Sequence, residues 1–346
     1  MDISALKHIV STLLQPRYLA MLTYIIKRIL YFLPTLLGVN LFVFALFFVV
    51  NTPDHIAQQA LGEKASTAEQ IQRWKAARGY DLPYFFNSKE DGVSKLTRTI
   101  FYQKSFKLFW GDFGASDMTL QPIGKEIARR IPASLCLTVP VFFASLLLNI
   151  LFAMLAAAHR GSGFDTGLQL TCVLTMSISS LIYIVAGQFI FARVLHLVPV
   201  SGFLPGWDMV RFLILPIIIG IAGNLGGGIR FYRTLFLEEI GKDYVRTARA
   251  KGLPENSVLF VHVLKNALIP ILTNVPVQLL TLIMGSLLLE NFFSIPGMGG
   301  YTISAINAQD FSIVRSMVFL GSVLYMLGLL LTDICYSVVD PRVRMR

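Results

Sequence analysis

The side chains that could carry chemistry in this chain are few and far apart. Its histidines are scattered and none is paired at metal-ligand spacing: His8, His55, His159, His196 and His262. The sequence contains no GxxxxGK[ST] phosphate-binding loop, no HExxH helix and no GxSxG nucleophile turn. We therefore predict no catalytic residues, no metal site and no cofactor, and we expect that the chain does not hydrolyse ATP itself.

The most distinctive polar stretch, Asp243–Gly252, lies between two long apolar runs. Its alanines favour a helix, Gly252 can adopt the left-handed conformation that ends one, and Pro254 prevents simple continuation. A second helical pattern starts at once, with Pro254 at its first position. The stretch predicts a helix, a sharp corner and another helix.

The faces of this predicted helix differ in character. One face carries apolar and small residues: Tyr244, Val245, Ala248 and Gly252. The basic residues lie off that face: Arg246, Arg249 and Lys251. Small residues would let another backbone approach closely, and the charges would fix the orientation of a partner. Taken alone, the stretch favours the plain alternative, a solvated helix rich in charge.

The composition indicates a membrane protein. Of the 346 residues, 55% are hydrophobic and 14% are charged, whereas ordinary soluble domains have about 25% charged residues. In so apolar a chain, the net charge of +10 is better explained by basic cytoplasmic loops than by nucleic acid binding. The cysteines lie in apolar runs and are predicted to be packing residues: Cys136, Cys172 and Cys335.

Uncharged runs predict the membrane-spanning helices, each of which needs about 20 residues. There are six such runs: Ile29–Val50, Ile131–Ala158, Leu168–Ala192, Phe212–Ile229, Asn266–Leu289, and Ser316–Thr332 with a possible extension to Val339. The first run is too long for a signal peptide, so we expect it to remain as an anchor. Basic loops fall on one side of a six-span arrangement, which places both termini in the cytoplasm.

These runs divide the chain into five expected parts. They are a cytoplasmic segment 1–28, a first transmembrane helix 29–50, an extracytoplasmic segment 51–130, a core of five helices 131–339 and a cytoplasmic tail 340–346. Within the extracytoplasmic segment, Ala68–Ala77 and Leu96–Phe109 are helix-like. Its aromatic residues either rest on the membrane interface or form a small cap: Phe101, Tyr102, Phe106, Phe109 and Trp110.

Two groups of residues in the apolar runs have alternative interpretations. Gly223 and Gly227 have the spacing that lets membrane helices approach closely, and with Asn224 they either pack helices or line a pathway. Glu290 and Asp333 lie near the ends of runs, where we expect both to stay hydrated. The runs contain no chain of acids of the kind that a proton-coupled transporter uses.

Five ordered motifs resemble those of a known family. They are YVRTARAKGL at Tyr244–Leu253, HVLKNALIP at His262–Pro270, GDFGAS at Gly111–Ser116, ENFFSIPGMG at Glu290–Gly299 and DPRVR at Asp340–Arg344. In their order along the chain and in their approximate spacing, these motifs resemble those of the peptide/nickel branch of bacterial ABC-importer permeases, the dipeptide and oligopeptide permease B subunits. The resemblance covers about residues 22–346 and implies a type I ABC-importer permease fold.

The resemblance implies roles for particular residues. The segment 243–265 looks like a coupling helix that docks on a cytoplasmic ATPase, through Tyr244, Arg246, Ala248, Arg249, Lys251, Gly252 and Leu253. Many importers begin this motif with Glu-Ala-Ala and end it with Leu-Pro, where this chain has Arg246-Thr247-Ala248 and Leu264-Lys265. A loop that would dock an extracytoplasmic binding protein is implied at Glu290, Phe293, Pro296, Gly297 and Gly299.

The implied partners are a second homologous permease, cytoplasmic ATP-binding subunits and an extracytoplasmic substrate-binding protein that delivers peptides. The implied location is the bacterial inner membrane. A close alternative is an importer of nickel or another small solute. A stand-alone channel or an ion-coupled transporter would not need the joint at Gly252, and an intramembrane enzyme would need the catalytic residues that the sequence lacks.

Overall fold

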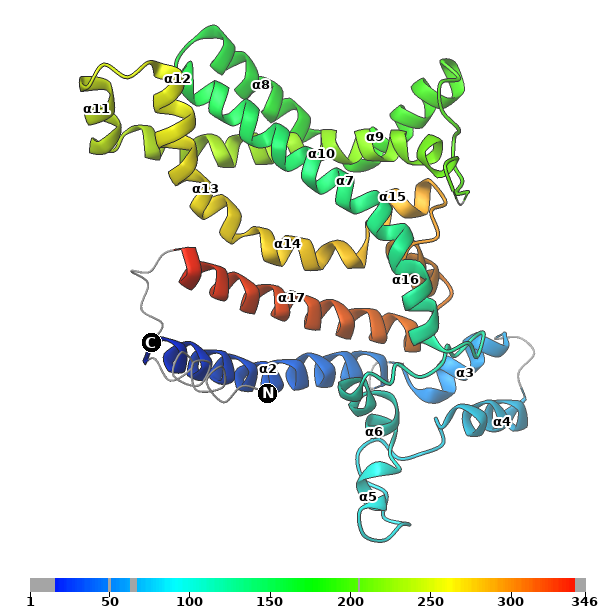
Figure 1. The fold of residues 1–346 in the computed structure, drawn as a ribbon. Helices are drawn as coiled ribbons and strands as arrows, with labels where there is room; N and C mark the ends of the chain where they lie inside the picture. Colours follow the sequence, from blue (N-terminus) through cyan, green and yellow to red (C-terminus); the bar gives the residue numbers. More distant parts are fainter. Residues whose placement is uncertain (1–15, 49–50, 63–66, 205, 340–346) are drawn as a thin grey trace, which may run out of the picture. The chain divides into compact units, whose positions relative to one another are not determined.

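The computed structural model describes residues 16–48, 51–62, 67–204 and 206–339 (Figure 1). The first part of the expected N-terminal segment and the motif that begins at Asp340 lie outside these residues. Throughout the described chain the elements are helices, and the one isolated bridge joins Ala115 and Pro122. The predicted all-α membrane fold is confirmed.

The helices fall into long rods and short connecting pieces. The long ones are α2 (Pro16–Phe48), α7 (Ile123–Ala158), α10 (Met209–Ile240) and α17 (Phe311–Val339). The others are α3 (Pro53–Leu61), α4 (Ala68–Arg78), α5 (Ser94–Thr97), α6 (Ile100–Lys104), α8 (Gly163–Ser177), α9 (Ser180–Gly187), α11 (Asp243–Ala250), α12 (Glu255–Ser257), α13 (Leu264–Thr273), α14 (Val275–Thr281), α15 (Leu287–Phe292) and α16 (Met298–Asn307). Within the described residues, six helices are long and apolar enough to cross a membrane, or up to seven with one bent pair.

The bent pair corrects the third predicted span. We expected one continuous helix over Leu168–Ala192, but α8 and α9 meet at a bend of 89°. Ile178 is extended between them, and the Ser179 hydroxyl accepts a hydrogen bond from the Leu181 N–H, which starts a new helix. The run is uncharged on both sides of the bend, so its charge pattern gave no sign of the bend.

The fifth predicted span, Asn266–Leu289, lies across two consecutive helical rods. One covers Glu255–Thr273 and the other Val275–Phe292, with only Asn274 between them in a right-handed helical conformation. Pro270 and Pro276 each lack a backbone donor near this point, which explains the interruption. With these rods counted as one kinked element and α8–α9 as one bent element, the segments number six, as predicted.

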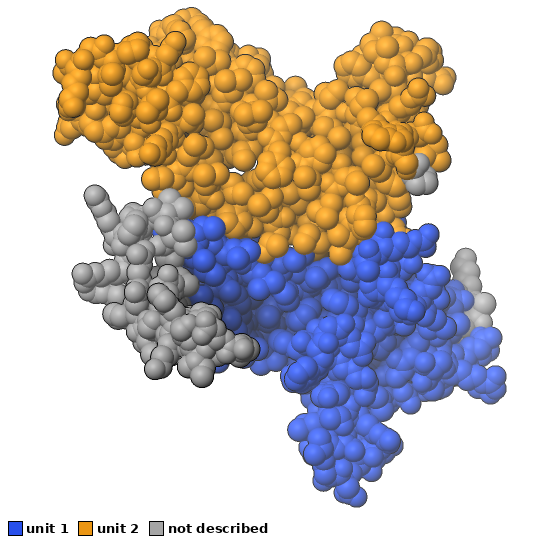
Figure 2. All heavy atoms as spheres, viewed as in Figure 1, with its two compact units in different colours: residues 1–129, 304–346 blue, residues 130–303 orange. Residues whose placement is uncertain are grey.

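The chain divides into two compact units, residues 1–129 with 304–346 and residues 130–303 (Figure 2). In the first unit α2 and α17 run side by side in opposite directions (Figure 1). Phe47 and Phe311 pack at one end with ring centroids 5.1 Å apart, and Arg28 pairs with Asp333 at 3.0 Å toward the other. Asp333 therefore has a salt-bridge partner, which the sequence did not reveal.

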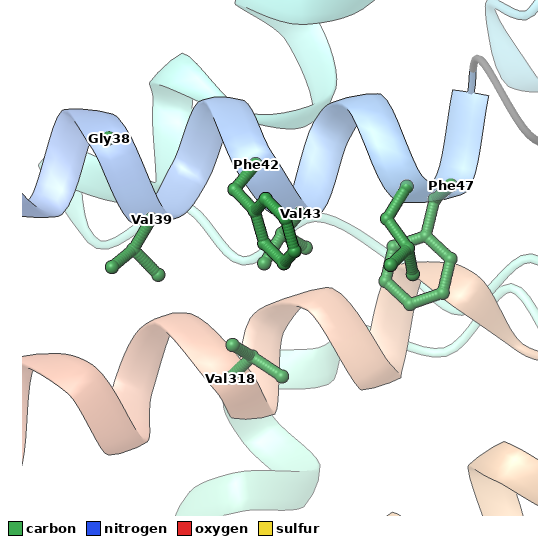
Figure 3. Close-up of a pocket in the computed structure, with 7 residues that line it drawn as sticks. Gly38, Val39, Phe42, Val43, Phe47 and Val318 are labelled. Atoms are coloured by element: carbon green, nitrogen blue, oxygen red, sulfur yellow. The ribbon is translucent and has the colours of Figure 1, made fainter.

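An apolar groove of about 530 Å³ opens between these two helices (Figure 3). Its lining consists of apolar side chains and one glycine: Gly38, Val39, Phe42, Val43, Leu46, Phe47 and Val318. Such a surface suits lipid chains and offers no hydrogen bond to a polar solute. The groove is therefore not a candidate site for a polar substrate.

Within the described residues, the segment 51–130 forms a cap with its own small core. Trp74 of α4 stacks on Tyr80 with ring centroids 5.4 Å apart, and both are buried with Phe44 and Phe48 at the end of α2. The predicted helix at residues 68–77 is present as α4, and a capping box begins it. The predicted helix at residues 96–109 was wrong as one element, because α5, α6 and a 3-10 turn divide it.

Two buried aspartates attach the cap to the first turn of α17. The Asp310 carboxylate accepts hydrogen bonds from the Ser116 hydroxyl and, at 3.2 Å, from the Asp117 N–H. The Asp117 carboxylate accepts from the Tyr80 hydroxyl at 2.7 Å and from the Ser312 N–H at 3.2 Å. The GDFGAS motif at Gly111–Ser116 leads directly into this junction.

Asp117→Asn should destabilise the cap. Burial favours the neutral acid, but Lys104 and the Tyr80 hydroxyl outweigh it and lower the pKa of Asp117 below its usual 3.8. A carboxyl group whose pKa is lowered by folding stabilises the folded state fully above its unfolded pKa. This stabilisation is lost as the pH falls through the folded pKa. We expect a loss of about 3 kcal/mol near neutral pH, measured by thermal unfolding of the purified protein. The difference from wild type should shrink below about pH 4, and the exposed Asp91→Asn should change little.

Candidate coupling joint and transport path

The helix–corner–helix predicted around Gly252 is present. α10 ends at Ile240 and, after two intervening residues, α11 begins with Asp243 in its first turn. After the corner, α12 begins at Glu255 and runs through a π-helical segment into α13. The joint therefore connects two of the membrane-sized rods of the second unit.

The small-residue face of α11 packs on the chain itself. Val245 has no exposed surface and Ala248 is 5% exposed. Both lie in a core with Tyr232 and Phe236 of α10 and Val258 of the π-helical segment. The part of this face at Val245 and Ala248 is therefore filled by the chain's own rods and cannot also seat another protein, whereas Gly252 of the same predicted face stays exposed.

The opposite face of the joint is open to solvent. Its exposed residues are Arg246, Thr247, Arg249, Ala250, Lys251, Gly252 and Leu253. Arg246 has only a long, exposed ion pair with Asp243, at 3.6 Å, which contributes little. The surface left for a partner is thus basic, with one apolar side chain, Leu253, at 40% exposure.

The corner depends on the backbone conformation of Gly252. Its φ is +77°, in the left-handed region that other residues rarely adopt. No atom lies within 4 Å of the position where a Cβ would stand, so conformation and not crowding requires glycine there. The Gly252 N–H donates to the Arg249 carbonyl at 2.9 Å, and the Leu253 N–H donates to the Ala248 carbonyl at 3.4 Å.

Two side-chain clamps hold α11 at its ends. At the first, buried Glu239 accepts hydrogen bonds from the Tyr244 hydroxyl and from Lys242 at 2.6 Å. Burial and the neighbouring Glu239 raise the pKa of Tyr244, so its hydroxyl stays a donor. At the second, the Arg249 guanidinium bonds both carboxylate oxygens of Glu255 across the corner, at 2.6 and 3.1 Å.

These clamps change how the predicted site residues are understood. Tyr244 and Arg249 were expected to meet a partner, but their polar groups bind within the joint. Sequence reasoning missed Glu239 and Glu255, although an acid six residues after Arg249, on the far side of a predicted corner, was a usable signal.

The loop after α15 is held by a buried carboxylate. Glu290 has no exposed surface and accepts hydrogen bonds from the N–H groups of Ser286 at 3.2 Å, Gly299 at 2.7 Å and Gly300 at 3.0 Å. The expectation that Glu290 stays hydrated was wrong, because backbone donors at the start of α16 replace water.

Burial also limits what this loop presents to a partner. Four of the five residues implied in binding-protein docking are buried: Glu290, Phe293, Gly297 and Gly299. A Cβ on Gly297 would collide with the Glu290 carboxylate, and one on Gly299 would lie 2.6 Å from the Ser286 backbone. These residues shape the loop, and Pro296 is the one that lies exposed.

Glu290→Gln should destabilise this loop. An ionised carboxylate only accepts hydrogen bonds, whereas an amide NH2 group placed among three N–H donors leaves at least one of them unpaired. We expect a loss of about 1–3 kcal/mol of unfolding free energy, measured by thermal melting in detergent. The exposed Glu69→Gln should melt like wild type, and equal melting of both variants would show that the buried carboxylate does not hold the loop.

The glycines of α10 that lie close to other helices are not the two singled out from the sequence. Close approaches occur at Gly220, whose Cβ would lie 3.0 Å from Val141, and at Gly226, whose Cβ would lie 2.8 Å from the Cys172 carbonyl. Gly223 and Gly227 have no atom within 4 Å of their Cβ positions. Gly223 and Gly227 therefore do not pack on another helix of the described chain, and with exposed Asn224 they lie on one side of α10. That these three residues line a pathway stays a prediction.

Comparison with known proteins agrees with this multi-helical membrane architecture. Residues 124–345 match the model of the family described as binding-protein-dependent transport system inner membrane component. The match covers α7 to α17 and includes the joint. The chain belongs to this family, which confirms the resemblance drawn from the motifs.

Individual relatives match over almost their whole length. A Brucella abortus protein, provisionally named as a permease of a peptide transport system, is 33% identical over 92% of this chain and 98% of its own. The dipeptide transport system permease protein DppB of Escherichia coli K12 is 32% identical over 94% of this chain and 99% of its own length. DppB of Alkalihalophilus pseudofirmus is 30% identical over 94% of this chain and 100% of its own length.

Proposed function

We propose that this chain is a membrane-spanning subunit of an ATP-driven peptide importer and that α11 couples it to a cytoplasmic ATPase. The observation that carries the proposal is the joint, a clamped helix between two membrane-sized rods with a basic, exposed outer face. The full-length similarity to peptide and dipeptide permeases supports peptides as the substrate.

In the proposed mechanism, a partner ATPase supplies the energy and the joint transmits it. The clamps fix α11 to α10 and to α12, so a displacement of α11 is passed to both rods instead of being absorbed by a loop. The ATPase must bind the joint differently in its open and closed states, because coupling needs a difference in binding free energy. This chain itself performs no catalytic step.

The remaining partners follow from the same proposal. A second permease completes the path, and a binding protein delivers the peptide to the extracytoplasmic side. Basic residues in the segment 230–265 support a cytoplasmic joint and cytoplasmic termini under the positive-inside rule. Binding-protein docking is assigned to exposed positions near Pro296 and on the cap.

Reconstitution tests the proposal. The chain, its second permease, the ATPase subunits and the binding protein are placed in vesicles, and uptake of a radiolabelled dipeptide is measured with ATP and with a non-hydrolysable analogue. We expect uptake only with ATP. Uptake of nickel instead of peptide would overturn the assignment of peptides as the substrate. Uptake without the ATPase subunits would overturn the ATP-coupled mechanism.

A further inference from the structure

The helices that follow the joint expose amide side chains at membrane depth. Asn274, between α13 and α14, and Gln278 of α14 are both exposed, and Thr281 is half-buried. Their spacing of four and three residues places them on one face of the rod. An amide that faces hydrocarbon loses its hydrogen bonds to water, so this face is unsuited to lipid.

This rod is also the least buried of the candidate membrane spans in its unit for which the buried share is known. Only 6% of the Val275–Phe292 stretch is buried, compared with 44% for Ile123–Ala158, 39% for Met209–Ile240 and 33% for Glu255–Thr273. The low coverage and the polar side chains occur on the same rod. A surface that is both uncovered and polar within a membrane is suited to water and polar solute.

The backbone of the rod is interrupted beside the amides. Pro270 and Pro276 remove two backbone donors, and the Asn274 amide donates to the Pro270 carbonyl at 3.2 Å. Beyond Thr281 the helix tightens into a 3-10 turn and breaks at Gly285, where φ is +71°. Broken helices with free backbone groups are typical of substrate sites at the middle of transporters.

We propose that the polar face formed by Asn274, Gln278 and Thr281 lines the transport path and hydrogen-bonds the main chain of the passing peptide. An amide side chain has both a donor and an acceptor, as a peptide group has, so one side chain can pair with any residue's backbone. The face carries no charge and therefore accepts peptides of either net charge. This inference rests on the proposed function and assigns residues to its substrate.

Cysteine labelling tests whether the polar face contacts water or lipid. In an assembled importer with Cys136, Cys172 and Cys335 replaced by alanine, Gln278→Cys is compared with Leu272→Cys, an exposed apolar position near the end of α13 in the preceding rod. We expect a charged, water-soluble methanethiosulfonate to modify position 278 and a lipid-soluble maleimide to modify position 272. A saturating dipeptide with binding protein and ATP should slow the reaction at position 278.

Transport kinetics give the second readout. Gln278→Met keeps the length of the side chain but not its hydrogen bonds, and we expect it to raise the peptide concentration for half-maximal uptake about fivefold. Recovery of the second permease during purification should be unchanged.

Different outcomes separate this inference from the function on which it rests. If wild type carries no peptide, the proposed function fails, whereas the labelling still reports on the path. If wild type carries peptide but position 278 reacts only with the lipid-soluble reagent, or if Gln278→Met releases the second permease, the face is not the path and the inference is overturned.

Discussion

Gly252→Val should abolish ATP-driven uptake while the importer still assembles. The φ of +77° at this corner is strained for any β-branched residue, at a cost of about 1–3 kcal/mol. No atom lies within 4 Å of the Cβ position, so the strain arises from the backbone conformation of the corner and not from crowding at the Cβ. We expect uptake to fall at least about tenfold, which corresponds to a lost coupling free energy of about 1.4 kcal/mol.

Two controls make this result specific. Gly252→Asn adds a side chain of similar size but tolerates the left-handed conformation, so it should keep most of the uptake. Co-purification of the ATPase with Gly252→Val should match wild type. Normal uptake by a well-expressed Gly252→Val importer would show that the conformation of the corner does not matter for coupling.

Arg246→Glu combined with Lys251→Glu should release the ATPase from the permease. Both side chains lie on the exposed face of the joint, and neither takes part in the two clamps. Reversal of two charges turns attraction into repulsion at an interface, and salt screens the effect over about 10 Å at 0.1 M. We expect recovery of the ATPase to fall at low salt and the deficit to narrow as salt is added.

The ion pair between Arg249 and Glu255 supplies the matched control for this charge reversal. Arg249→Glu alone places two carboxylates together at the corner and should reduce uptake. Arg249→Glu with Glu255→Arg restores opposite charges across the corner, so uptake should recover in part without loss of the ATPase. The Arg246 and Lys251 double variant and wild type are compared at low salt. If both recover the same amount of ATPase, the exposed basic face is not the contact.

The sequence predicted the large elements of the fold well, because each depends on a local property. Uncharged runs of the right length predicted the membrane-sized segments, and the turn chemistry of Gly252 and Pro254 predicted the corner. Both signals arise from residues that are close together in the chain. The bend between α8 and α9 was missed because hydropathy does not depend on the direction of a helix.

Side-chain partners were predicted less well, since they depend on what folding brings together. The small face of α11 was visible in the sequence, but whether it packs on this chain or on another protein was not. Glu290 gave a similar difficulty, because the N–H groups of Gly299 and Gly300 that replace its water belong to the next helix. The clamp between Arg249 and Glu255 exists only once the corner has formed.

The exposed face of α11 should contact the ATPase directly, and cross-linking tests this contact. Thr247→Cys, on that face, and Thr234→Cys, exposed on α10 before the joint, are each prepared in the importer without other permease cysteines. A short bifunctional thiol reagent is then added in the absence and presence of ATP. We predict a cross-link from position 247 to the ATPase whose yield changes with ATP, and little from position 234. Failure of position 247 to cross-link, or equal yields from both positions, would contradict the account.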